Sequence, residues 1–196
     1  MKNFLLKHCR KLVALCIAVL LEPVSAEVAT GIDEQTGLRS WEWTEADVSI
    51  QLVQRLPDQT RAFFQGRGFA SSDADTIARS CVFQTIFRND GKRPLTYDLD
   101  DWRIISQGQQ NFLITRERWE QKWSEGEVSQ AARIALRWSL LPTRQDFESG
   151  DYNWGMTSFG LPPGESFDLT LVVTIKNEVI TRNITGIVCA SERTSN

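Results

Sequence analysis

Clustered carboxylates are the side chains of this sequence whose types and spacing come closest to a reactive site. Asp98, Asp100 and Asp101 follow one another near the end of an expected strand. The period of two along a strand puts Asp98 and Asp100 on one face, where a carboxylate pair serves glycoside hydrolysis or calcium binding. A solvated acidic edge that discourages strands from pairing edge to edge explains the same residues, and we favour it. A second acidic cluster, interpreted in the same way, comprises Asp146, Glu148 and Asp151.

Histidine-dependent chemistry is almost excluded, because His8 is the only histidine in the sequence. Without His8 the chain has no Ser-His-Asp triad, no Cys-His pair and no imidazole ligand for a metal. No glycine-rich phosphate loop of the dinucleotide-binding or Walker type occurs either. We therefore expect a protein that is not an enzyme and that holds no metal and no cofactor.

The N-terminal segment has the pattern of a secretory signal peptide. An apolar run of ten residues, Leu12 to Leu21, follows four basic side chains and is too short to cross a bilayer as a helix. Small residues then lead to Ala26, as signal peptidases require. The sequence predicts a cleavable signal peptide over residues 1–26, cut after Ala26, and a periplasmic or secreted location.

Net charge limits the partners of the remaining 170 residues. They carry 18 basic and 24 acidic side chains, a formal net charge of −6. Nucleic acids and anionic lipid surfaces attract basic proteins instead, so we expect neither nucleic acid nor, after signal cleavage, membrane as a partner. We predict a flexible leader over residues 27–40 and a single domain over residues 41–196.

Two cysteines, Cys81 and Cys189, follow the predicted signal peptide. In an oxidising compartment a pair without a third partner most simply forms a disulfide. A redox-active pair would be expected to have a C-x-x-C spacing or a neighbouring histidine, and the sequence has neither. We predict a structural bond that joins two strands far apart in the sequence.

Alternation of apolar and polar residues predicts strands over 48–53 and 81–88. In the second of these, the inward face is either Cys81, Phe83, Thr85 and Phe87 or the complementary set with Val82, Ile86 and Arg88. Turn-forming residues over 89–94 predict a hairpin to the next strand or pair of short strands. A closing hairpin is expected to turn at residues 176–178.

Helical periodicity appears in two regions, near 57–79 and 115–141. Pro57 suits the first position of a helix, and Pro142 ends the last one. Since strands flank both regions, the helices are expected to be insertions in a mainly β fold, with an α+β fold as the alternative.

Three motifs resemble bacterial exported immunoglobulin-like sandwich domains. They are a strand ending in Phe87-Arg-Asn89, the turn Gly91-Lys-Arg-Pro94-Leu95 before an Asp-rich strand with Trp102, and Leu161-Pro-Pro163-Gly164-Glu165 before a late strand. The resemblance implies an immunoglobulin-like antiparallel β-sandwich. It covers about a third of the chain after residue 26, and it implies no activity.

Aromatic residues supply the candidate binding surface. Exposed rings stack on sugars, and loops commonly carry binding residues, so we select the expected loop over 151–160. The residues expected to bind there are Asp151, Tyr152, Trp154 and Phe159. Arg116 and Arg118, on the first helix expected within 115–141, are the second choice. The tryptophans expected to pack in the core are Trp102, Trp119, Trp123 and Trp138.

These observations favour a non-enzymatic, exported accessory or assembly protein that acts by contact with another exported protein. The first alternative is a module that binds a carbohydrate or another small ligand through Tyr152, Trp154 and nearby acids. A hydrolase built on paired carboxylates is the further alternative.

Overall fold

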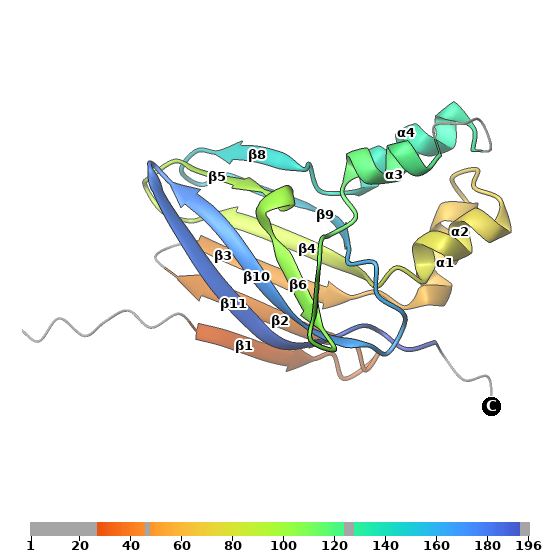
Figure 1. The fold of residues 1–196 in the computed structure, drawn as a ribbon, viewed down its shortest axis with the longest axis horizontal. Helices are drawn as coiled ribbons and strands as arrows, with labels where there is room; N and C mark the ends of the chain where they lie inside the picture. The colour runs from red at the N-terminus through yellow and green to blue at the C-terminus, as the bar shows by residue number, and fades with distance from the viewer. Residues whose placement is uncertain (1–26, 46–47, 124–127, 193–196) are drawn as a thin grey trace, which may run out of the picture.

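The computed structural model describes residues 27–45, 48–123 and 128–192. The predicted signal peptide lies outside them. Two antiparallel β-sheets pack face to face, and helices gather at one end of this sandwich (Figure 1). The prediction of a mainly β sandwich with inserted helices is confirmed. Within the described residues, no helix has both the length and the apolar character needed to cross a bilayer.

The first sheet has five strands, all antiparallel to their neighbours, in the order β1-β2-β3-β4-β9. They are β1 (Glu27–Ile32), β2 (Arg39–Glu45), β3 (Val48–Gln54), β4 (Val82–Asn89) and β9 (Tyr152–Ser158). Strand β9 is therefore an edge strand, and its outer face continues the outer face of β4.

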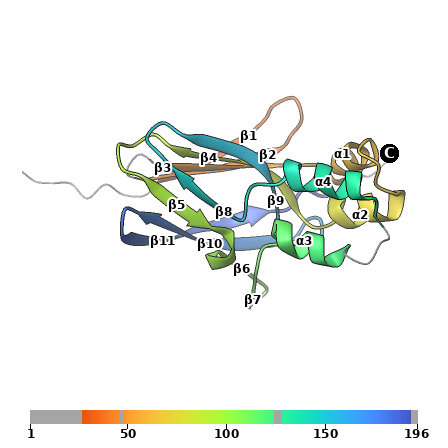
Figure 2. The same cartoon turned by 90° about the horizontal axis from the view of Figure 1, so that it is seen from above.

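The second sheet is built around the long strand β10, which pairs with β11 along one side and with both β5 and β6 along the other. Strand β8 extends this sheet beside β5, and β7 extends it beside β6. The strands are β5 (Leu95–Asp98), β6 (Arg103–Ser106), β7 (Gln109–Asn111), β8 (Arg144–Phe147), β10 (Ser166–Ile175) and β11 (Glu178–Val188). A 3-10 turn, Leu99–Asp101, separates β5 from β6. Figure 2 shows the two layers from above.

Alternation along β4 decides which side chains enter the space between the sheets. Phe83 and Phe87 are fully buried there, and Phe87 lies 5.0 Å from Tyr97 of the facing sheet, measured between ring centroids. The face with Cys81, Phe83, Thr85 and Phe87 is thus the inward one. The opposite face of β4 contacts the helices at Val82 and reaches the surface at Arg88.

Four helices form a second hydrophobic cluster against the outer face of β4 and β9. They are α1 (Pro57–Gln65), α2 (Ser71–Ala78), α3 (Arg116–Lys122) and α4 (Gln130–Ser139). Pro57 occupies the start of α1, and the Ser129 side chain accepts a hydrogen bond from the Ala132 N–H at the start of α4. Stacked Trp119 and Trp123 rings, 4.8 Å apart, fill the cluster.

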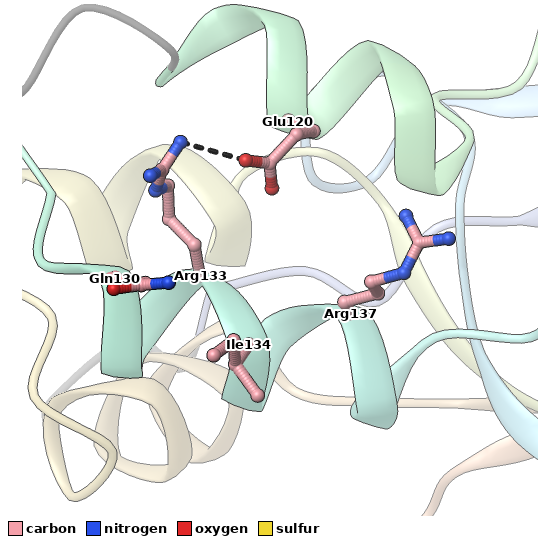
Figure 3. A pocket seen from close by; sticks show the side chains of 5 residues that line it. All are labelled: Glu120, Gln130, Arg133, Ile134 and Arg137. Carbon is pink, nitrogen blue, oxygen red and sulfur yellow. Dashed lines mark hydrogen bonds and ion pairs between the residues drawn. The ribbon is translucent and has the colours of Figure 1, made fainter.

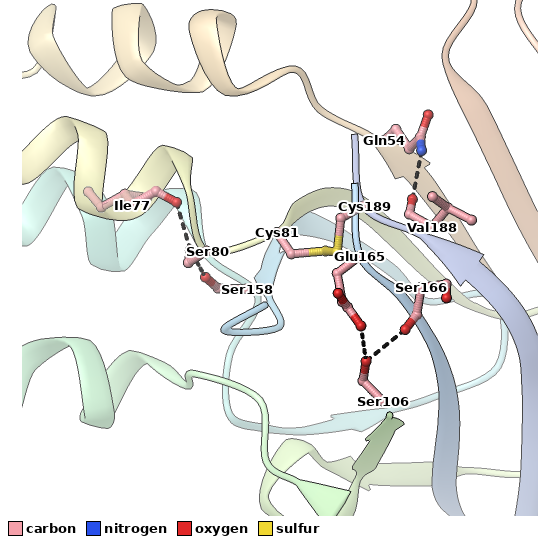
Figure 4. Close-up of a disulfide and its surroundings, with 10 residues drawn as sticks. All are labelled: Gln54, Ile77, Ser80, Cys81, Ser106, Ser158, Glu165, Ser166, Val188 and Cys189. Carbon is pink, nitrogen blue, oxygen red and sulfur yellow. Dashed lines mark hydrogen bonds between the residues drawn. A yellow bond between two sulfur atoms is a disulfide. The ribbon is translucent and has the colours of Figure 1, made fainter. Parts of the chain in front are cut away.

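The predicted disulfide is confirmed. Cys81 and Cys189 are 108 positions apart in the sequence, and their Cα atoms lie 5.2 Å apart. The bond ties the residue before β4 to the residue after β11, so it links the two sheets near the helical end (Figure 4). A disulfide of this kind indicates an oxidising, extracytoplasmic environment. The closing hairpin of β10 and β11 is also confirmed.

The segment predicted to be a flexible leader differs from the structure, which has the hairpin of β1 and β2 there. Asp33 Oδ1 accepts hydrogen bonds from the N–H groups of Gln35 and Thr36, and these bonds shape the turn. Strand β1 has no apolar alternation because it pairs at an edge through its backbone and its side chains are exposed from residue 28 onward.

The hairpin predicted through residues 89–94 is wrong. Strand β4 pairs with β3 and β9, whereas β5 pairs with β8 and β10 in the other sheet. The Asn89 side chain donates to the carbonyl oxygens of Arg93 and Glu148, at 2.9 and 3.0 Å. These bonds hold the turn while the chain crosses between the layers.

Candidate functional site

The loop expected over residues 151–160 is mostly the edge strand β9. Its pairing with β4 sets Tyr152 opposite Arg88 and Trp154 opposite Ile86. Tyr152 and Trp154 are two positions apart, so both point outward. They remain 60% and 65% exposed. The Arg88 guanidinium carbon lies 5.2 Å from the centre of the Tyr152 ring.

The other residues selected in this segment do not join these two rings. Phe159 is only 1% exposed and packs between Phe83 and Phe167, so it belongs to the sandwich core. Asp151 accepts a hydrogen bond from the Glu148 N–H at 2.8 Å and thereby holds a turn. The sequence could not separate these roles because both residues flank the exposed strand.

Trp138 was expected in the core, but it is 77% exposed. The buried face of α4 carries Ala132 and Leu136, and Leu140 continues it past the helix end. Trp138 is two residues beyond Leu136, about 200° around the helix. This rotation turns the indole away from the helical cluster and towards the outer face of the first sheet.

A groove of about 490 Å³ lies between α4, the outer face of the first sheet and the chain around α1. We call it the arginine–tryptophan groove. The sheet contributes Gln84, Trp154 and Met156 to its lining, and α4 contributes Trp138. Its volume falls within the roughly 300–1,000 Å³ that is usual for ligand sites.

The third wall of the arginine–tryptophan groove comes from the chain around α1. Arg55 precedes this helix, Phe63 lies in its last turn, and Arg67 follows it. The guanidinium carbons of Arg67 and Arg55 lie 3.3 and 5.5 Å from the centre of the Phe63 ring. Both cations thus stack against one aromatic side chain at the groove.

The two guanidinium groups form no ion pair with the described residues. Among the described residues, neither Arg55 nor Arg67 has a carboxylate within ion-pair distance. Arg67 donates one hydrogen bond to the Phe63 carbonyl oxygen at 3.0 Å, whereas the buried Arg55 Nε has no hydrogen-bond partner in the described part of the chain. Burial lowers the pKa of Arg55, and the positive charge of Arg67 lowers it further.

Arg116 and Arg118, the second choice from the sequence, do not line this groove. Arg116 Nε donates to the Leu140 carbonyl oxygen at 3.1 Å, and Nη2 donates to the same oxygen, so Arg116 fixes the end of α4. Burial lowers the pKa of Arg116. Arg118 lies 3.2 Å from Asp100 and stacks on Phe112.

A second hollow, of about 350 Å³, lies between α3 and α4 (Figure 3). Its charged groups are paired within the protein. Arg133 lies 2.7 Å from Glu120, and Arg137 lies 3.6 Å from Glu117. Because these charges compensate one another, this hollow attracts an ionic ligand less strongly than the arginine–tryptophan groove does.

The carboxylate clusters have local structural contacts. Asp98 accepts a hydrogen bond from the Asp100 N–H at 3.0 Å, and Asp146 accepts one from the Thr96 hydroxyl at 2.6 Å. Across the described residues, no group of three or more His, Cys, Asp or Glu side chains is arranged to hold a metal ion.

Sequence reasoning found Trp154 but missed Arg55, Phe63, Arg67 and the outward position of Trp138. The spacing of Phe63 and Arg67, four apart at a helix end, is the signal that could have paired an aromatic ring with a cation. Comparison of the chain with protein-family models, curated proteins and solved structures gives no match.

Proposed function

We propose that this is an exported, non-enzymatic accessory or assembly protein that binds another exported protein through the arginine–tryptophan groove. The observation that carries the proposal is the exposure of Trp138 and Trp154 on facing sides of a groove whose two arginines form no ion pair within the described chain. Exposed tryptophans and arginines are the residues that most often dominate protein interfaces. The disulfide supports a compartment outside the cytoplasm, and we propose the periplasm, reached by the predicted signal peptide.

The proposed fold relationship remains that of exported immunoglobulin-like sandwich domains. Two packed antiparallel sheets support it. Such domains serve many functions on one framework, so the groove rather than the fold carries the functional proposal.

The first test compares single substitutions on α4. Trp138→Ala removes a side chain that is 77% exposed, so folding should be preserved. We expect partner affinity to fall by about 2 kcal/mol, or roughly 30-fold in Kd. The full chain and its variants are immobilised, and bound periplasmic protein is quantified by mass spectrometry.

The matched control is Ile134→Ala, one turn earlier on α4 and also exposed. Recovery of the same partner in equal amounts by the wild type and by both variants would contradict the proposal. So would the recovery of no protein by the folded, disulfide-bonded wild type.

A carbohydrate-binding function is the second candidate. The outward rings of Tyr152 and Trp154 on one face of β9 favour it, because sugar C–H faces stack on exposed aromatic rings. Titration with neutral oligosaccharides, followed by tryptophan fluorescence, distinguishes the two candidates. A saturable shift that Trp154→Ala abolishes would favour the carbohydrate function over protein contact.

A further inference from the structure

The arginine–tryptophan groove is positively charged although residues 27–196 are acidic overall. Its lining includes Arg55 and Arg67, and none of the described residues that line it is acidic. In contrast, the described structure pairs Arg61, Arg133 and Arg182 with carboxylates at other surfaces. The groove is therefore a local site where an anion gains electrostatic energy.

Arg55 makes this site more selective than a solvated surface charge would. Its Nε is buried and lacks a hydrogen-bond partner among the described residues. Because Arg55 is partly removed from water, its charge attracts an anion in the groove more strongly than a fully solvated charge would. Guanidinium groups match carboxylates particularly well, because their planar N–H groups can donate two parallel hydrogen bonds.

The remainder of the groove suits an apolar group next to that anion. Trp138 and Trp154 are its exposed aromatic walls, and Met156, which belongs to the helical cluster, also lines it. Thioether and indole groups accommodate varied apolar side chains. The site thus offers a place for a negative charge and a place for an apolar side chain within one hollow of about 490 Å³.

We propose that the groove binds an acidic peptide segment, with a carboxylate at Arg55 and Arg67 and an adjacent large apolar side chain beside Trp138 and Trp154. This rests on the proposed function and specifies the partner: an exposed segment in which Asp or Glu neighbours a large apolar residue. A hollow of about 490 Å³ takes only a few side chains, whereas each partner contributes about 20–30 residues to a standard interface between folded proteins.

The test uses short random peptides displayed on phage and selected against the immobilised full chain. We expect the enriched peptides to carry Asp or Glu beside a large apolar residue. The most enriched peptide is then synthesised in two forms, as selected and with its acidic residues replaced by Gln or Asn. The amide form should bind at least about tenfold more weakly, and rising salt should weaken only the acidic form.

Substitutions in the chain complete this test. Arg67→Gln, at an exposed position, should weaken the acidic peptide at least about tenfold without loss of folding. Arg55→Gln should do the same, and circular dichroism will verify that it folds. The control is Arg93→Gln, which removes an exposed arginine from the turn between the sheets and should leave Kd unchanged.

Failure of this inference can be distinguished from failure of the proposed function. Enriched neutral peptides that require Trp138 but not Arg67 would overturn the acidic segment and leave a protein-binding groove in place. Enriched peptides whose binding requires neither Trp138 nor Arg67 would overturn both the acidic-segment inference and the proposed function. No enriched peptide, together with binding of uronic-acid oligosaccharides that Arg67→Gln abolishes, would replace the peptide by an acidic glycan.

Discussion

Single side chains in this protein show where the fold tolerates features that a core would not. Trp138 and Trp154 leave large apolar surfaces in solvent, while Arg55 keeps a buried donor without a partner in the described structure. Single exposed apolar side chains are common at protein surfaces. What supports a binding role is that two exposed tryptophans and two arginines line one groove, where a partner can cover the indole rings and compensate the positive charge.

Tyr97 provides a residue-scale prediction about pH. Burial raises the pKa of this phenol above its ordinary value of about 10, and the nearby charge of Arg116 opposes the shift only in part. The folded state therefore keeps its proton at a pH where the unfolded state loses it. Stability that is present below about pH 10 must decline as the pH rises further.

We expect the free energy of unfolding in urea to fall between about pH 10 and pH 11 in the wild type, and to fall less steeply in Tyr97→Phe. Tyr152→Phe, which removes the other of the two tyrosines from an exposed position, is the control and should follow the wild type. If the free energy of unfolding falls equally steeply with pH in the wild type and in Tyr97→Phe, the Tyr97 phenol does not cause the loss of stability at alkaline pH.

Residue roles were only partly predictable from sequence. Trp102, Trp119 and Trp123 were placed in the core correctly, because their apolar neighbours recur at the period of their elements. Trp138 shares the apolar spacing of α4, yet it lies on a helix whose narrower buried stripe is Ala132 and Leu136. The stripe with Ala132 and Leu136 packs on the other helices, and the side with Trp138 does not. This choice depends on tertiary packing, which the residue pattern of one helix does not determine.

At the scale of elements, the contact between α4 and β9 sets the shape of the groove. Leu141 N–H donates to the Met156 carbonyl oxygen at 3.0 Å, just beyond the end of α4. This approach is possible because Gly155 has no side chain: a Cβ atom there would lie 2.7 Å from Leu141 N. The glycine thus lets the chain that follows α4 lie directly against β9, beside the groove.

Gly155→Ala should push the end of α4 away from β9. Overpacking against backbone atoms typically costs about 1–3 kcal/mol, and we expect that loss in urea unfolding together with weaker partner binding. Gly66→Ala is the matched control, because its Cβ would lie 3.5 Å from the nearest atom, at a backbone conformation any residue adopts. A variant Gly155→Ala as stable as Gly66→Ala would refute the close approach as a determinant of the groove.

The positions of the strands were predicted more reliably from the sequence than the pairing between them. The strands over 48–53 and 81–88 and the closing hairpin follow from alternation and turn residues, which act locally. The turn over 89–94 was assigned to a hairpin because Asn, Asp and Gly favour tight turns. Whether such a turn returns to its own sheet or crosses to the other is decided by the strands already paired with β4, and those are distant in sequence.

For the molecule as a whole, the disulfide connects both sheets beside the helical end. A bond that closes a loop of this length, between residues 108 apart, restricts the unfolded chain strongly. The double variant Cys81→Ala/Cys189→Ala should lose about 2–5 kcal/mol of stability in urea unfolding. Reducing agent should destabilise the wild type to a similar extent and leave the double variant unchanged, and a loss below about 1 kcal/mol would contradict a structural role.

The whole molecule joins a two-layer sandwich to a helical end that shapes one groove. The sandwich positions β4 and β9, the helices add Trp138 and the residues around Phe63, and the disulfide holds the two layers together. The central claim is that partners bind at this groove and not at the rest of the surface.

Site-specific photo-crosslinking tests that claim most directly. A photoreactive phenylalanine analogue is placed at position 154, and, in a control chain, at position 179, where Val179 is comparably exposed. The account predicts one dominant crosslinked exported protein from position 154, lost when Arg67→Gln is added, and none from position 179. Crosslinking of the same protein from both positions, or from position 179 alone, would contradict it.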